Sequence, residues 1–260
     1  MKQLDRRKRI RYVFAAELKN DILNVRFFMG ALLILTAALL SEQVHLEFLI
    51  DAGGSQEGPG WFLAYSFCSN GPHTLLFVPI AVSLAAGGEA EKELHSRFAL
   101  FSCARTGKKQ YILGKMAGFI FSGGLMLCTA MLLMLGVSCI VFGDIPVLSD
   151  NGPAFFELLL KVLASFLRGF LNGALWAMAG GFAAVTARNC YLGYAVPFIL
   201  YYVLSVFQER YYRDYLFLNP RYWMAPVYYS DLFCIVVLLT LCVLIGYLLI
   251  RALKRRLDDA

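Results

Sequence analysis

The sequence lacks the short motifs of the commonest catalytic, nucleotide and metal sites. It has no Walker A loop, because residues 107–109 (GKK) and 114–116 (GKM) lack the Ser or Thr and the Gly spacing that such a loop needs. It has no GxSxG, CxxC or HExxH motif, and its three histidines stand far apart. These absences argue against ATP hydrolysis by the chain itself and against a bound metal or cofactor.

Charge is also scarce, and the scarcity is uneven. Hydrophobic residues make up 59% of the 260, and the mean hydropathy is +0.63, which is more apolar than an ordinary soluble domain needs. The seven cysteines are scattered, so the sequence predicts no disulfide framework. Apolar runs long enough to cross a membrane predict an all-α membrane protein, a single domain over residues 1–260 with six transmembrane helices. The runs are 22–40 (interrupted by Arg26), 58–88, 116–142, 169–187, 189–208 and 232–250.

The basic residues of the loops predict the orientation of these spans. Eight Lys or Arg precede residue 27, five lie between residues 87 and 111, one is Arg188 and four follow residue 250. The other three loops hold only Arg210, Arg213 and Arg221, so the bias is eighteen to three. Because cytoplasmic loops are enriched in Lys and Arg, we expect a multi-pass protein of the cell membrane with both termini cytoplasmic. Nucleic-acid binding is the other interpretation of the net charge of +6, and we expect no such partner.

The first 21 residues predict a helix that lies in the membrane interface. Ile10, Val13, Phe14 and Leu18 share one helical face, and bases occupy the other. Two roles remain open for it, an anchor that fixes the topology and an elbow that transmits motion.

Residues 87–115, which we call the lever, are the most polar stretch between two apolar runs. Carboxylates come first and bases later, and the apolar residues between them predict a short helix with one apolar face. A solvated loop that merely obeys the positive-inside rule is the alternative. We expect the carboxylates to pair with the later bases, within the chain or on another protein. The candidate docking residues are Glu89, Glu91, Glu93, Arg97, Phe98, Phe101, Arg105, Lys108 and Lys109.

A long helix is predicted over residues 154–186. Glu157, Lys161 and Arg168 lie within about 40° on its outer part, at 100° per residue. The stripe is either a polar extension with a Glu157–Lys161 pair or a strip that faces a translocation path. Further in, Gly169, Gly173, Ala177 and Gly181 form a small-residue ridge, which suits packing within the chain or a dimer seam equally.

The last outer loop, residues 208–231, is crowded with aromatic side chains. Eight of the nineteen residues from Tyr211 to Tyr229 are aromatic. We expect short re-entrant helices broken near Asn219-Pro220, with Tyr222 and Trp223 packed against the fifth and sixth spans. The loop is either a plain aromatic belt or a lid over an exit path.

The six spans, the amphipathic start and the long first inner loop together resemble the membrane (permease) subunit of type-2 ABC exporters. Residues 85–89 (AAGGE) resemble the end of that family's second span. Residues 105–109 (RTGKK) and 111–115 (YILGK) are similar to its basic turn and to its entry into the third span. At Leu94-His95 the sequence departs from the family's usual Gly-Thr.

The resemblance implies a permease that encloses a path with a second permease chain, identical or homologous, and moves by alternating access. It implies a coupling helix in the lever that binds a separate ABC ATPase, which carries ATP and Mg²⁺. Phe98 and Phe101 would then anchor that contact. A non-transporting scaffold, sensor or immunity subunit is the competing class, and a membrane enzyme is the third.

Overall fold

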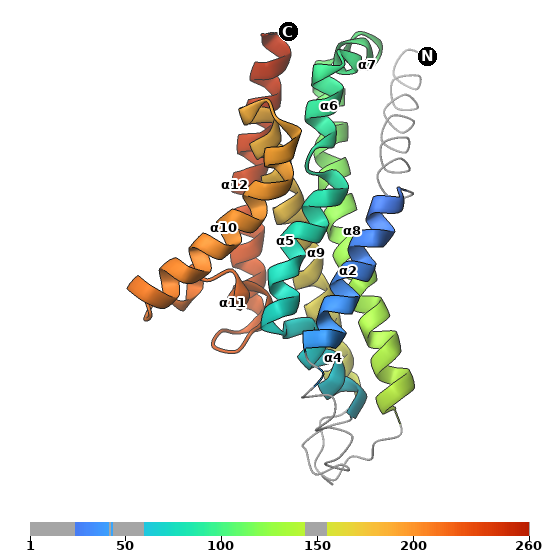
Figure 1. Cartoon of the computed structure of the whole chain (residues 1–260), viewed down its shortest axis with the longest axis vertical. Coiled ribbons are helices and arrows are strands. Elements are labelled where there is room, and N and C mark those ends of the chain that lie inside the picture. The colour runs from blue at the N-terminus through green and yellow to red at the C-terminus, as the bar shows by residue number, and fades with distance from the viewer. Residues whose placement is uncertain (1–23, 42, 44–59, 144–154, 260) are drawn as a thin grey trace.

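We describe the protein from a computed structural model, in residues 24–41, 43, 60–143 and 155–259 (Figure 1). Helices dominate these ranges, and no strand occurs in them. The elements, with the labels of Figure 1, are α2 (Val25–Ser41), α4 (Gly60–Asn70), α5 (Pro72–Ala86), α6 (Glu89–His95), α7 (Phe98–Thr106), α8 (Lys108–Phe142), α9 (Phe155–Ala187), α10 (Cys190–Tyr211), η1 (Leu216–Leu218), α11 (Arg221–Met224) and α12 (Asp231–Asp258).

Five helices are long and apolar enough to cross a membrane: Pro72–His95, which joins α5 to α6, and α8, α9, α10 and α12. They correspond to five of the six predicted spans, and the all-α prediction is confirmed for the described residues. The remaining predicted span is represented by α2, which has 17 residues and is shorter than the others. The predicted run 58–88 is broken at Gly71, where α4 ends and Pro72 starts a new helix.

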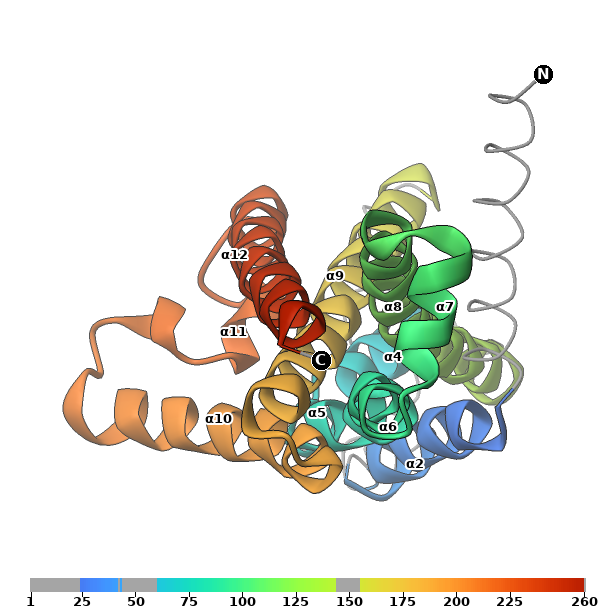
Figure 2. The same ribbon diagram turned by 90° about the horizontal axis from the view of Figure 1, so that it is seen from above.

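Helix α9 is the centre of the bundle, with α8, α12, α10 and α5 packed around it (Figure 2). Its predicted length is confirmed, since it runs from Phe155 to Ala187. The small-residue ridge faces α8: a Cβ on Gly123 of α8 would lie 2.5 Å from the carbonyl oxygen of Gly173. Only hydrogen fits at that distance, so the two glycines let the backbones touch. The ridge is therefore used inside the chain, and the dimer-seam alternative is wrong for it.

Helices α9 and α10 form a hairpin. The connection is Arg188, in the left-handed region at φ 56°, and Asn189, whose side chain accepts a hydrogen bond from the backbone N–H of Tyr191 at 2.9 Å. After this turn α10 leans away from the other helices (Figures 1 and 2). Half of its 22 residues are exposed, and only four are buried.

Three glycines join the start of the lever to the body. A Cβ on Gly87, after α5, or on Gly180 of α9 would lie 2.6 Å from the carbonyl oxygen of Gly193 in α10. Beside them the Ser83 hydroxyl is 2.6 Å from the Pro79 carbonyl oxygen and 3.2 Å from that of Tyr194. The start of the lever is thus held against two neighbouring helices by backbone contact.

The interfacial helix predicted over residues 1–21 lies outside the described residues. In the last outer loop, η1 and α11 flank Asn219-Pro220, so the predicted break is confirmed.

Candidate functional site

The lever is two short helices that cap one end of the bundle. Helix α6 continues from α5, and the chain then turns at Arg97, whose φ is 61°. Helix α7 crosses the end of the bundle, and Gly107, at φ 93°, turns the chain into α8 (Figure 2). The single short helix expected from the sequence is therefore divided. The left-handed turn places Leu94 on one piece and Phe98 and Phe101 on the other.

Each glutamate of α6 pairs with a base from a different helix. Glu91 accepts from the Arg256 guanidinium of α12 at 3.0 Å, and Glu93 accepts from Lys115 of α8 at 2.6 Å. Glu89 accepts from Arg26 of α2 at 2.7 Å and also pairs with Lys92 at 3.4 Å. These pairs attach α6 to α2, α8 and α12 at once.

These pairs correct the predicted partners within the chain. The sequence suggested Arg97, Arg105, Lys108 and Lys109, but the three glutamates meet Arg26, Lys92, Lys115 and Arg256. Lys108 instead bonds to the end of α12, at 2.9 Å from the Leu257 carbonyl oxygen and 3.0 Å from Asp258.

The physical reason is the helical period. At 100° per residue, Glu91 points about 160° away from both Glu89 and Glu93, so the three carboxylates cannot share one face. They therefore meet different neighbours, whereas α7 turns away with the later bases.

Helix α7 presents an apolar face edged with bases. Phe98 and Phe101 are 57% and 70% exposed, although large apolar side chains at the end of a bundle are normally covered. Arg105 lies on the same helical face and is exposed, as are Arg97 just before α7 and Lys109 in the first turn of α8. The arrangement can bind a partner that offers an apolar groove with acidic edges.

The opposite face of α7 is fixed to the bundle. Ala99 is completely buried, and Cys103 is half-buried and packs on the core. Burial raises the pKa of the Cys103 thiol, and the nearby Lys108 ammonium partly opposes the shift. Helix α7 is thus a supported platform.

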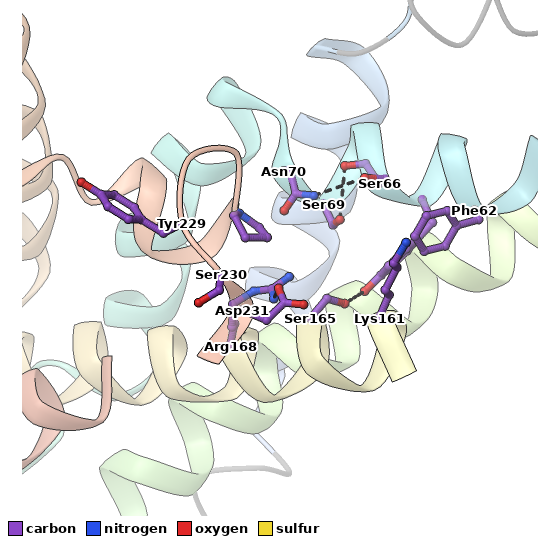
Figure 3. A pocket seen from close by; sticks show the side chains of 12 residues that line it. Phe62, Ser66, Ser69, Asn70, Lys161, Ser165, Arg168, Tyr229, Ser230 and Asp231 are labelled. Atoms are coloured by element: carbon purple, nitrogen blue, oxygen red, sulfur yellow. Dashed lines mark hydrogen bonds and ion pairs between the residues drawn. The ribbon is translucent and has the colours of Figure 1, made fainter. Parts of the chain in front are cut away.

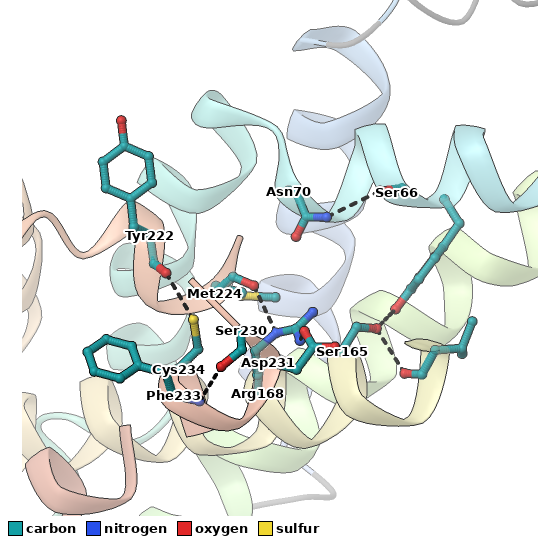
Figure 4. Close-up of polar contacts among 12 residues, drawn as sticks. Ser66, Asn70, Ser165, Arg168, Tyr222, Met224, Ser230, Asp231, Phe233 and Cys234 are labelled. Atoms are coloured by element: carbon teal, nitrogen blue, oxygen red, sulfur yellow. Dashed lines mark hydrogen bonds and ion pairs between the residues drawn. The ribbon is translucent and has the colours of Figure 1, made fainter. Parts of the chain in front are cut away.

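A second polar cluster lies toward the other end of the bundle, where α9, α11 and α12 meet (Figure 4). Arg168 of α9 is 3% exposed; its guanidinium pairs with Asp231 and its Nε donates to the Met224 carbonyl oxygen at 3.0 Å. Arg168 therefore faces inward, toward the start of α12.

A cavity of about 440 Å³ opens beside this ion pair (Figure 3). We call it the outer pocket. Helices α4 and α9 and the segment before α12 line it with Phe62, Tyr65, Ser66, Ser69, Asn70, Lys161, Ser165, Arg168, Pro226, Tyr229, Ser230 and Asp231.

The predicted polar stripe of α9 is split by this geometry. Lys161 and Arg168 both line the outer pocket, whereas Glu157 is exposed and does not line it. No ion pair joins Glu157 to Lys161 in the part of the chain that the structure describes, so the proposed i,i+4 pair is absent. An ion pair between two exposed side chains would contribute little to the stability of the fold in any case.

Tyr222 and Trp223 lie on α11. Trp223 stacks on Trp176 of α9 with ring centroids 6.3 Å apart, and its indole N–H donates to the Phe217 carbonyl oxygen at 2.6 Å. Tyr222 meets the edge of Tyr228 at 5.2 Å, and its carbonyl oxygen accepts from the Cys234 thiol. Helix α11 packs on α9 and α12, so the predicted packing on the sixth span is confirmed, and the packing on α9, the fourth predicted span, was not predicted.

Sequence reasoning missed several residues of both clusters. The signal was present for Ser165 and for Asn172, whose amide nitrogen lies 3.4 Å from the Met224 sulfur. With Lys161 and Arg168 these two residues fall within about 60° on α9. For Asp231, Arg256 and the residues of α4 no local signal exists, because their partners lie more than 60 residues away in the sequence.

Among the described residues, no group of three His, Cys, Asp or Glu side chains is placed to hold a metal ion. No protein-family model and no curated protein matches the chain.

Proposed function

We propose that the chain is the permease subunit of an ATP-driven exporter and that α7 is its docking helix for a separate ATPase subunit. The architecture that supports this is a multi-pass bundle of apolar helices with a supported, partly apolar helix across one end. The sequence pattern of residues 85–115 and its resemblance to type-2 ABC exporters support the same assignment. The eighteen-to-three bias of basic residues supports a cytoplasmic location for this end.

The exposure of Phe98 and Phe101 carries the proposal. The two rings lie on a helix whose opposite face is buried. Their exposure therefore belongs to a fixed surface and does not result from an irregular loop. A partner with a matching groove would remove them from water, and the bases around them would add complementary charge to an acidic rim.

The lever connects this surface to the spans. Motion of α7 would be passed to α6 and from there, through the three glutamate pairs, to α2, α8 and α12. The backbone contacts of Gly87 with α10 would add a fourth route. ATP and Mg²⁺ would stay on the partner, and this chain would supply the mechanical elements and half of the path, with a second permease chain supplying the rest.

Photo-crosslinking from α7 tests this assignment. A photoreactive phenylalanine analogue is placed at Phe101, and at Tyr247 in a control chain, since both side chains are exposed aromatics, at 70% and 62%. In cells of the natural host, the analogue at position 101 should capture a polypeptide with a Walker A motif, and the analogue at position 247 should not. If position 101 captures only lipid or this chain itself, the proposal fails.

A further inference from the structure

The outer pocket is rich in hydrogen-bond donors for which none of the described residues supplies an acceptor. Asn70 uses one amide N–H on the Ser66 hydroxyl at 3.3 Å, which leaves its second N–H and the Ser66 proton unused. The Ser230 hydroxyl accepts from the backbone N–H of Phe233, which leaves its proton unused as well. Lys161 makes no ion pair with any described residue.

Other polar groups of the pocket are already satisfied. The Ser165 hydroxyl donates to the Val162 carbonyl oxygen at 2.9 Å, so Tyr65 is the donor in its 2.5 Å contact with Ser165 (Figure 4). Arg168 is neutralised by Asp231. Among the described residues the pocket therefore has one positive charge without a paired carboxylate, that of the exposed Lys161, and several donors around it that no described residue accepts.

A group that accepts hydrogen bonds, donates none and carries a single negative charge complements this set. A phosphodiester meets all three conditions, since its charge is −1 at neutral pH and its oxygens only accept. The volume of about 440 Å³ exceeds what a bare ion needs and lies in the range of small-molecule sites.

The position of the pocket relative to the predicted spans indicates which kind of molecule would supply such a group. Arg168 immediately precedes the uncharged run 169–187, and Asp231 immediately precedes the uncharged run 232–250. Each run has 19 residues and would extend about 28 Å as a helix, close to the thickness of a hydrocarbon core. With these runs in the membrane, the pocket lies at the level of the lipid headgroups.

We propose that the outer pocket binds the phosphodiester of a phospholipid headgroup, with Lys161 as its charged ligand and Ser66, Asn70 and Ser230 as neutral donors. Phe62 and Tyr229 supply apolar walls at the sides of the pocket (Figure 3). This inference does not depend on the ATPase contact, because the two sites lie toward opposite ends of the bundle.

The test is native mass spectrometry of the full chain in detergent, titrated with dioctanoyl phosphatidylglycerol. Lys161→Gln should weaken binding about tenfold or more, which is the usual effect of losing one hydrogen bond to a charged group. Lys161→Arg keeps the charge and should retain binding. The matched control is Arg210→Gln, which removes an exposed positive charge on the predicted outer side, away from the pocket, and should leave binding unchanged.

Two further probes identify the recognised group. Dioctanoylglycerol, which lacks the phosphate, should not bind at the same concentrations, and inorganic phosphate should not displace the lipid. Equal binding by wild type and Lys161→Gln would overturn the proposal, as would equal binding of dioctanoylglycerol. Displacement by inorganic phosphate at matched concentration would also overturn it, because the pocket would then take a soluble anion.

Discussion

Replacing Glu91 with Gln removes one charge from the ion pair that ties the lever to α12. The Glu91 side chain is 5% exposed and that of Arg256 is 21% exposed, and their nearest atoms are 3.0 Å apart. With an effective dielectric constant of about 20, two unit charges at that distance attract by about 5 kcal/mol before desolvation is subtracted. Glu91→Gln leaves Arg256 without this compensation.

We expect Glu91→Gln to lower the free energy of unfolding by about 3 kcal/mol, the lower end of the cost of breaking a buried pair, because Arg256 keeps some contact with water. The matched control is Asp258→Asn. It breaks the Lys108–Asp258 pair, which also joins the lever to α12 but is more than half exposed on both sides. Such a pair contributes about 0–1 kcal/mol.

The assay is reversible unfolding of the purified chain in mixed micelles, followed by circular dichroism as the denaturing detergent increases. The double variant Glu91→Gln with Arg256→Gln should recover most of the lost stability, because no charge is then left buried and unpaired. The reasoning is refuted if Glu91→Gln and Asp258→Asn cost the same, or if the two substitutions of the buried pair are additive.

Four further outcomes follow from the same geometry. Gly193→Ala should reduce the yield of folded protein, because Cβ at that position would meet the Gly87 carbonyl oxygen at 2.5 Å; a normal thermal unfolding midpoint would contradict the tight junction. Trp223→Ser removes the stack on Trp176 and should impair export more than assembly, so full export at matched membrane levels would reduce the aromatic loop to a passive belt. An impermeant maleimide should label Cys103 only after the membrane is opened. The reaction should be slow at neutral pH, because burial raises the pKa of the thiol and the thiolate is the reactive form. Labelling of Cys103 in intact cells would contradict the predicted cytoplasmic location of the lever. Native mass spectrometry should find two permease chains for each pair of ATPase subunits, and a single permease chain would refute the shared path.

Local features of the sequence predicted the elements that local forces determine. The length of α9 and the break at Pro220 follow from an apolar run and from the restriction that proline imposes. Periodicity also placed Lys161 and Arg168 on one stripe of α9, and both do line the outer pocket.

The neighbours of each face could not be predicted in this way. The stripe that carries Arg168 fixes a direction around the axis of α9, but the residue found there is Asp231, 63 positions later in the chain. Likewise Glu91 meets Arg256 across 165 positions. Such pairs depend on how the helices cross, which in turn depends on contacts such as that between Gly123 and Gly173.

The docking role of α7 is tested most directly by recovery of the ATPase with the purified permease. The full chain is captured from membranes of the natural host, as wild type and as the double variant Phe98→Ala with Phe101→Ala, at matched membrane levels. Tyr247→Ala serves as the control for loss of an exposed aromatic elsewhere. If both phenylalanines are buried anchors, the double variant should weaken association by about 2–4 kcal/mol, and the ATPase should be lost from it but kept by the control. Equal recovery of the ATPase with all three chains, across a series of salt concentrations, would show that α7 is not the docking helix.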